Sequence, residues 1–221
     1  MKKAFTLVVL IVTPTMAFAQ GSVTLGNQSG LIKQWTSATD PTLISVQKGG
    51  GYVQLIAAPV GTSLVNPLFS SASGTLNYSS LSGFLAANPG WLGAWGPNGG
   101  TASNPALIAM NNGVISGGTY TINNIGDGAD AEYFLISWTG AFTTADAAIA
   151  AFNGRQAMFG ESAVFTTATG NPLRSGGGPG TPVNLKTTFT GMVLAPLIPE
   201  PSSFALAGVG LAALLVFRHR R

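Results

Sequence analysis

Glycine and proline divide the middle of this chain into short segments, and this feature limits what the chain can fold into. Of 221 residues, 30 are Gly and 13 are Pro. Both residue types weaken or end helices, so long helices are not expected between them. The segments that remain are rich in β-branched and aromatic residues, a composition that favours short strands. The sequence therefore predicts a mainly β fold.

Seven strands and one helix are predicted. The strands are 22–25, 43–46, 52–57, 114–122, 132–138, 163–167 and 186–194. The helix spans 145–152, because Thr144 can cap it, Asp146 lies in its first turn and Gly154 follows as a stop signal. We expect a single antiparallel β-sandwich-like domain with one short helix. Residues 79–113 and 171–182, which are rich in Gly, Pro and Asn, are predicted as a long surface excursion and a flexible loop.

The side chains that are missing exclude several kinds of chemistry. The chain has no Cys, and its single His is His219. A body without Cys and His cannot form a Ser-His-Asp or Cys-His catalytic group or the usual zinc sites. Without disulfides, the hydrophobic core must stabilise the fold alone. We therefore expect no enzyme activity and no cofactor.

The excess positive charge of the chain comes from its two ends. The formal net charge is +3, and only 8% of residues are charged. Between residues 20 and 198, five basic residues face six acidic ones, which leaves −1. The basic residues are Lys33, Lys48, Arg155, Arg174 and Lys186, and the acidic ones are Asp40, Asp127, Asp130, Glu132, Asp146 and Glu161. A body without excess positive charge is not expected to bind nucleic acid.

The C-terminus has three parts in a fixed order. Pro199, Glu200 and Pro201 precede an apolar run of 14 residues, 204–217, and a basic end at 218–221. As a helix the run would be about 21 Å long, short against a hydrocarbon core of about 30 Å. Ser202 and Ser203 can cap the start of the helix, and the long arginines can extend the span, so we predict a transmembrane helix at about 203–217. The alternative is a buried core helix.

This three-part tail resembles the PEP-CTERM sorting signal of exported proteins in Gram-negative bacteria. The resemblance covers residues 197–221 and departs from the commonest pattern at Ile198 and His219. It implies a protein held in the inner membrane until exosortase, a membrane-embedded enzyme, processes it near the Pro-Glu-Pro. The recognition residues would then be Pro199, Glu200 and Pro201. Arg218, Arg220 and Arg221 would be the membrane stop on the inner side.

The N-terminus has the features of a secretory signal peptide. A positive start at Met1-Lys2-Lys3 is followed by an apolar segment, 4–12. Ala17 and Ala19 form an A-x-A cleavage site before Gln20. We therefore expect a signal peptide at 1–19, with the Sec translocon and signal peptidase as partners, and an exported β-rich domain at 20–196. A prepilin leader is the alternative, but Phe5 lacks the preceding Gly and the nearby Glu of that type.

Three acidic residues lie close together at Asp127, Asp130 and Glu132. On an extended strand, Asp130 and Glu132 share one face, with Cα atoms about 6.7 Å apart. The simplest interpretation is a polar turn, 123–130, that closes a hairpin. Calcium binding and carboxylate catalysis of glycoside hydrolysis are the alternatives.

Trp91 and Trp95 lie in a glycine-rich part of the predicted excursion. Exposed indole rings offer flat faces on which a sugar ring can stack. Large aromatic residues in such loops also pack onto the core and bury area there. The sequence leaves both interpretations open.

Three functional hypotheses follow from these features. The favoured one is a non-enzymatic exported protein, placed at the cell surface or in an extracellular polysaccharide matrix. The second is a glycan-binding or ice-binding module, because similar tails occur on ice-binding proteins and extracellular polysaccharide is a candidate partner. The third is a glycosidase that uses carboxylates alone.

Overall fold

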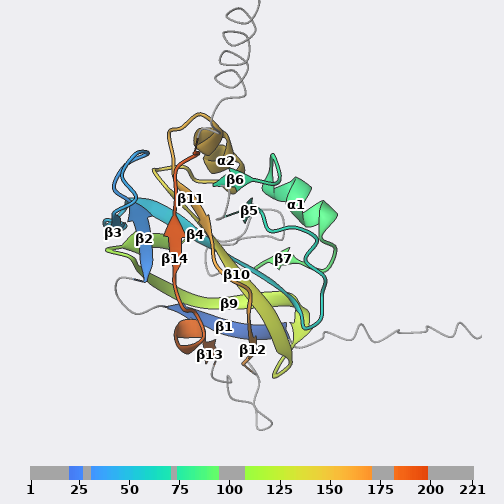
Figure 1. Ribbon diagram of the computed structural model, residues 1–221. Coiled ribbons are helices and arrows are strands. Elements are labelled where there is room, and N and C mark those ends of the chain that lie inside the picture. Colours follow the sequence, from blue (N-terminus) through green and yellow to red (C-terminus); the bar gives the residue numbers. More distant parts are fainter. Residues whose placement is uncertain (1–19, 27–30, 71–73, 95–107, 171–181, 199–221) are drawn as a thin grey trace, which may run out of the picture.

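The computed structural model describes residues 20–26, 31–70, 74–94, 108–170 and 182–198, and these residues form a mainly β body (Figure 1). Its strands are β1 (Gln20–Gly26), β2 (Ile32–Trp35), β3 (Leu43–Ser45), β4 (Gly51–Pro59), β5 (Phe69–Ser70), β6 (Thr75–Leu76), β7 (Leu92–Gly93), β8 (Ile108–Asn111), β9 (Val114–Gly126), β10 (Asp130–Thr139), β11 (Phe159–Glu161), β12 (Phe165–Ala168), β13 (Val183–Asn184) and β14 (Met192–Leu194). Its helices are α1 (Leu81–Ala87), α2 (Ala145–Asn153) and the 3₁₀ helix η1 (Leu185–Thr187). None of the helices in this described part is long and apolar enough to cross a membrane.

Two long strands, β4 and β10, form the centre of the main sheet. They pair antiparallel over nine residue pairs, from Ala131 opposite Pro59 to Thr139 opposite Gly51. The nine-stranded sheet has the order β11-β10-β4-β8-β9-β1-β13, and β12 and β7 pair with β10 and β4. Both central strands are apolar along most of their length because both of their faces are covered.

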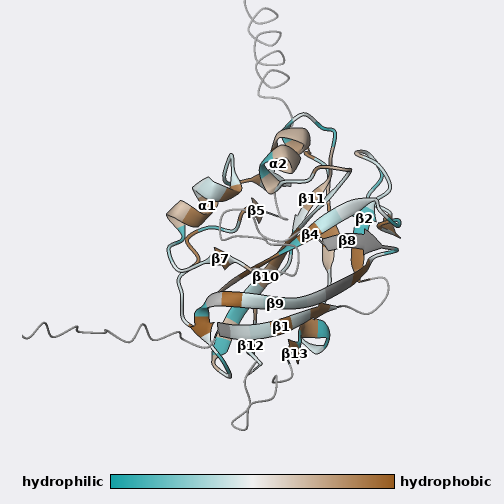
Figure 2. Cartoon of the chain, turned by 180° about the vertical axis from the view of Figure 1, so that it is seen from behind, coloured by the Kyte–Doolittle hydropathy of each residue, from teal (hydrophilic) through white to brown (hydrophobic). Residues whose placement is uncertain are grey.

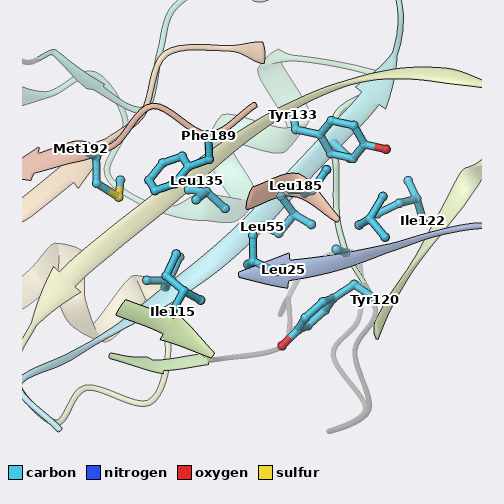
Figure 3. Packing of buried hydrophobic residues seen from close by; sticks show 14 of the residues in the cluster. Leu25, Leu55, Ile115, Tyr120, Ile122, Tyr133, Leu135, Leu185, Phe189 and Met192 are labelled. Carbon is cyan, nitrogen blue, oxygen red and sulfur yellow. The ribbon is translucent and has the colours of Figure 1, made fainter. Parts of the chain in front are cut away.

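Side chains that alternate along β4 and β10 enter two separate core clusters. Leu55 and Tyr133 point into the first cluster, with side chains from β1, β9, η1 and β14 (Figure 3). Ile56 and Phe134 point into the second, which α1, α2 and β5 cover. Figures 1 and 2 place α1 and α2 in the part of the body away from β1 and β13. The period-two alternation of a strand thus builds a core on each side of the same two strands.

A second sheet has the order β14-β2-β3 and packs on the first cluster. Ile32 of β2 and Leu194 of β14 are fully buried in that cluster. On the outer side, Leu43 of β3 and Val193 of β14 are 44% and 39% exposed. One face of this small sheet therefore belongs to the core and the other faces solvent.

The predicted surface excursion at 79–113 is wrong for most of its described part. Ser80 caps α1 by accepting a hydrogen bond from the Gly83 N–H at 3.0 Å, and Leu81 and Phe84 are buried. Further on, β7 pairs with β4, and β8 pairs with both β4 and β9. Leu81, Phe84 and Trp91 of this segment belong to the second cluster and help to shield the apolar residues of β4 and β10 from water.

The predicted helix is confirmed as α2, in both its position and its caps. The Thr144 hydroxyl accepts a hydrogen bond from the Ala147 N–H at 3.1 Å, and Asp146 lies in the first turn. Gly154 is the C-cap, and its N–H donates to the Ala150 carbonyl. Local capping chemistry sets both ends of this helix, so the sequence is sufficient to place it.

The expectation of an antiparallel fold with one helix needs four further corrections. The body has a second α-helix, α1, and two parallel pairs, β1 with β13 and β14 with β2. The predicted strand 186–194 divides into η1 and β14, separated by Gly191 at φ +113°. A turn joins β9 to β10, but β9 pairs with β1 and β8 while β10 pairs with β4, β11 and β12, so 123–130 does not close a hairpin.

Candidate functional site

The described chain ends at a firmly attached segment, 195–198, that directly precedes the Pro-Glu-Pro. Ala195 and Phe159 exchange two backbone hydrogen bonds of 2.9 and 3.0 Å. Gly160 allows this close approach, because a Cβ there would lie 2.5 Å from the Val193 carbonyl oxygen. Leu197 packs against the second cluster, and Ile198 approaches Gly74 so closely that an added Cβ on Gly74 would lie 3.0 Å from its side chain. The fold thus continues to the residue before Pro199.

Most of the residues predicted for targeting lie outside the described part. These are Ala17 and Ala19 of the cleavage site, Pro199, Glu200 and Pro201 of the sorting motif, and Arg218, Arg220 and Arg221 of the membrane stop. Gln20, the predicted mature start, is the first residue of β1 and pairs with Gly126 of β9. The predicted mature chain would therefore begin within the main sheet.

The three clustered carboxylates surround the β9–β10 turn. The Ala129 N–H donates to the Gly126 carbonyl across this turn, and Gly128 has φ +70°. Asp130 is exposed at the start of β10, whereas an oxygen of Glu132 accepts a hydrogen bond from the Gly61 N–H at 3.2 Å. Among the residues that the structure describes, no three His, Cys, Asp or Glu side chains are grouped so that they could hold a metal.

Trp91 is a core residue, while Trp95 lies outside the described residues. The Trp91 side chain is 1% exposed, and its ring centroid lies 5.1 Å from that of Phe134. Its indole N–H donates to the Ser63 carbonyl at 3.2 Å. Trp91 therefore has no free face on which a sugar could stack, and packing is the interpretation that the structure supports for it.

Glu161 is a partly buried carboxylate that the sequence did not single out. It ends β11, and its Oε2 accepts a hydrogen bond from the Phe69 N–H at 2.9 Å. Burial raises the pKa of its carboxyl to about 7, against the opposing effect of hydrogen bonds from the backbone of Phe69 and Leu68. The partners lie 92 residues away, so no local sequence signal marks the site.

Two more body carboxylates bind backbone N–H groups. Asp146 Oδ1 accepts from the Leu81 N–H at 2.7 Å and so joins α2 to the start of α1. Asp40 Oδ1 accepts from the Thr42 N–H at 2.9 Å, and hydrogen bonds from Thr42 lower the pKa of that exposed carboxyl. With Glu132 and Glu161, four of the six body acids are engaged in holding loops and strand ends in place.

An open depression of about 390 Å³ lies on the outer side of the three-stranded sheet. Leu31, Lys33, Leu43 and Val193 are among the residues that line it, and Lys33 is its one ionisable side chain. A single amine without an acid or base beside it provides no pair for proton transfer. The residues that line this depression therefore include no acid–base pair for catalysis.

Comparison with protein families decides the nature of the C-terminal segment. The family model of the PEP-CTERM protein-sorting motif matches residues 197–221. Residues 197–221 are a PEP-CTERM sorting motif. No curated protein and no solved structure matches the chain significantly.

The PEP-CTERM motif marks the protein for export and implies exosortase as its processing partner. It also implies an intermediate in which the tail anchors the protein in the membrane during sorting. The match begins at Leu197, which packs on the second cluster. The sorting motif and the folded body therefore overlap by two residues, Leu197 and Ile198.

Proposed function

We infer that this protein is a non-enzymatic exported protein, delivered to the cell surface or to an extracellular polysaccharide matrix. The observation that carries this proposal is the PEP-CTERM match at 197–221, joined without a spacer to a folded body. A signal peptide at 1–19 would bring the chain to the translocon, and the tail would then hold it in the membrane until exosortase acts.

The chemistry of the body supports a structural role. The chain has no Cys, and its single His lies in the tail. Of the acids that remain, Glu132, Asp146 and Glu161 accept hydrogen bonds from backbone N–H groups that are distant in the sequence. A general acid or base must be free to reach its substrate, and carboxylates committed to the fold are poorly suited to that task.

Replacement of Pro199, Glu200 and Pro201 by alanine should abolish processing and leave membrane insertion intact. Insertion depends on the apolar run and the basic end, whereas recognition depends on the motif. Cell fractionation and intact-mass measurement in cells with exosortase distinguish the two steps. The Ser202→Ala, Ser203→Ala double variant is the matched control and should be processed like the wild type. Normal processing of the motif variant would contradict the proposed function.

A further inference from the structure

The distance between the folded body and the membrane anchor is short. Five residues, 199–203, separate Ile198 from the start of the apolar run at Phe204. Fully extended, the six steps from Ile198 to Phe204 span about 20 Å. The headgroup layer takes up about 6 Å of this length. When the tail is inserted, Ile198 therefore lies at most about 14 Å from the membrane surface.

The part of this tether outside the headgroup layer, about 14 Å, is shorter than the radius of the body, which is about 20 Å for a domain of this size. The body cannot turn its chain exit away from the membrane, because the connecting residues cannot pass around it. The described chain leaves no slack at this point, since Ala195, Leu197 and Ile198 are all attached to the fold. One surface of the body must therefore face the bilayer.

The residues around the exit define that surface, which we call the exit surface. It comprises Gly74, which Ile198 approaches, Thr75 at the start of β6, Asn153 at the end of α2 with the following residues 154–156, and Leu197 and Ile198. Phe152 links α2 to β5 and β11 through ring contacts with Phe69 and Phe159. Figures 1 and 2 show that the described chain ends beside α2, at the end of the body opposite β13.

The chemistry of the exit surface suits phospholipid headgroups. Asn153, Arg155 and Gln156 are exposed there and present amide and guanidinium donors. Arg155 is the one charged side chain among the described residues of this surface. A basic residue close to an anionic bilayer is attracted to it.

We propose that the exit surface is a membrane-facing surface, held against phospholipid headgroups while the tail is inserted. This inference rests on the proposed function in one respect, that the tail anchors the intermediate. Exosortase would then bind the Pro-Glu-Pro motif in a narrow gap between the body and the bilayer.

The chain has no Cys, so single labels can be placed without background. Asn153→Cys labels the exit surface, and Lys186→Cys labels η1, next to β13 at the far end; both positions are exposed. The full-length chain from cells without exosortase is reconstituted into vesicles of phosphatidylethanolamine and phosphatidylglycerol with a headgroup-bound quencher. Quenching should be severalfold stronger at position 153 than at position 186.

A flexible Gly-Ser insert of about twelve residues between Ile198 and Pro199 adds about 20 Å of average reach. This insert should abolish the difference between the two labels, whereas the same insert between Gly128 and Ala129 should preserve it. Equal quenching of the two labels without an insert would overturn the inference and leave the proposed function standing. No quenching at either position would show that the tail is not an anchor, and it would contradict both this inference and the proposed function.

Discussion

The Trp91→Ala variant should lose about 3–5 kcal/mol of unfolding free energy, the range measured for replacing buried large aromatic side chains by alanine. Trp91 is 1% exposed, contacts Phe134 and binds the Ser63 carbonyl through its indole N–H. Its loss would leave a cavity between β7 and the central strands. Urea unfolding followed by circular dichroism measures the effect without relying on tryptophan fluorescence.

Trp35→Ala is the matched control for this prediction. Trp35 lies on β2 and is only partly buried, so its removal should cost clearly less than removal of Trp91. A wild-type unfolding midpoint in Trp91→Ala, together with weaker binding to a polysaccharide, would show that Trp91 is a ligand-stacking residue. That result would contradict the assignment of Trp91 to the core.

At pH 8 the Glu161→Gln variant should be more stable than the wild-type protein, and at pH 5 the difference should shrink. In the folded state the pKa of Glu161 is raised from its ordinary value of 4.5 to about 7. The folded protein therefore binds a proton more tightly than the unfolded chain, and stability falls as pH rises from about 4.5 to 7. The loss is on the order of 3 kcal/mol. Gln stays neutral and can still accept the Phe69 N–H.

Urea midpoints at pH 5 and pH 8 test this prediction. The body has no histidine, the residue type whose ordinary pKa lies in this interval, so few other groups contribute. Glu132→Gln removes a carboxylate that also accepts a backbone hydrogen bond, and this control should keep the wild-type pH dependence. If the stability of the Glu161→Gln variant depends on pH in the same way as that of the wild type, burial of Glu161 is not the cause of this dependence.

Elements governed by local chemistry could be predicted from the sequence. Helix α2 has Thr144 and Gly154 at its ends, and β4 and β10 are rich in β-branched and aromatic residues. Helix α1 was missed because it has seven residues and contains Gly83, which lowers helix propensity. Its stability comes from burial of Leu81 and Phe84, a tertiary effect that no local pattern reveals.

Near residue 190 the sequence pattern also predicted the wrong structure. The Thr-rich segment before β14 has the composition of a strand, yet Asn184 accepts a hydrogen bond from the Lys186 N–H and starts η1. Glu161 was missed as well, because its partners, Leu68 and Phe69, are far away in the chain. The sorting motif, in contrast, is linear, and the family match at 197–221 confirms its recognition from sequence.

The central claim is that the tail is a sorting signal removed by exosortase, and one measurement tests it most directly. The intact mass of the wild-type protein is determined from cells with exosortase and from otherwise identical cells without it. We expect a chain without the apolar run 204–217 only where exosortase is present, and a chain that retains 199–221 where it is absent. The same mass in both strains would contradict the claim.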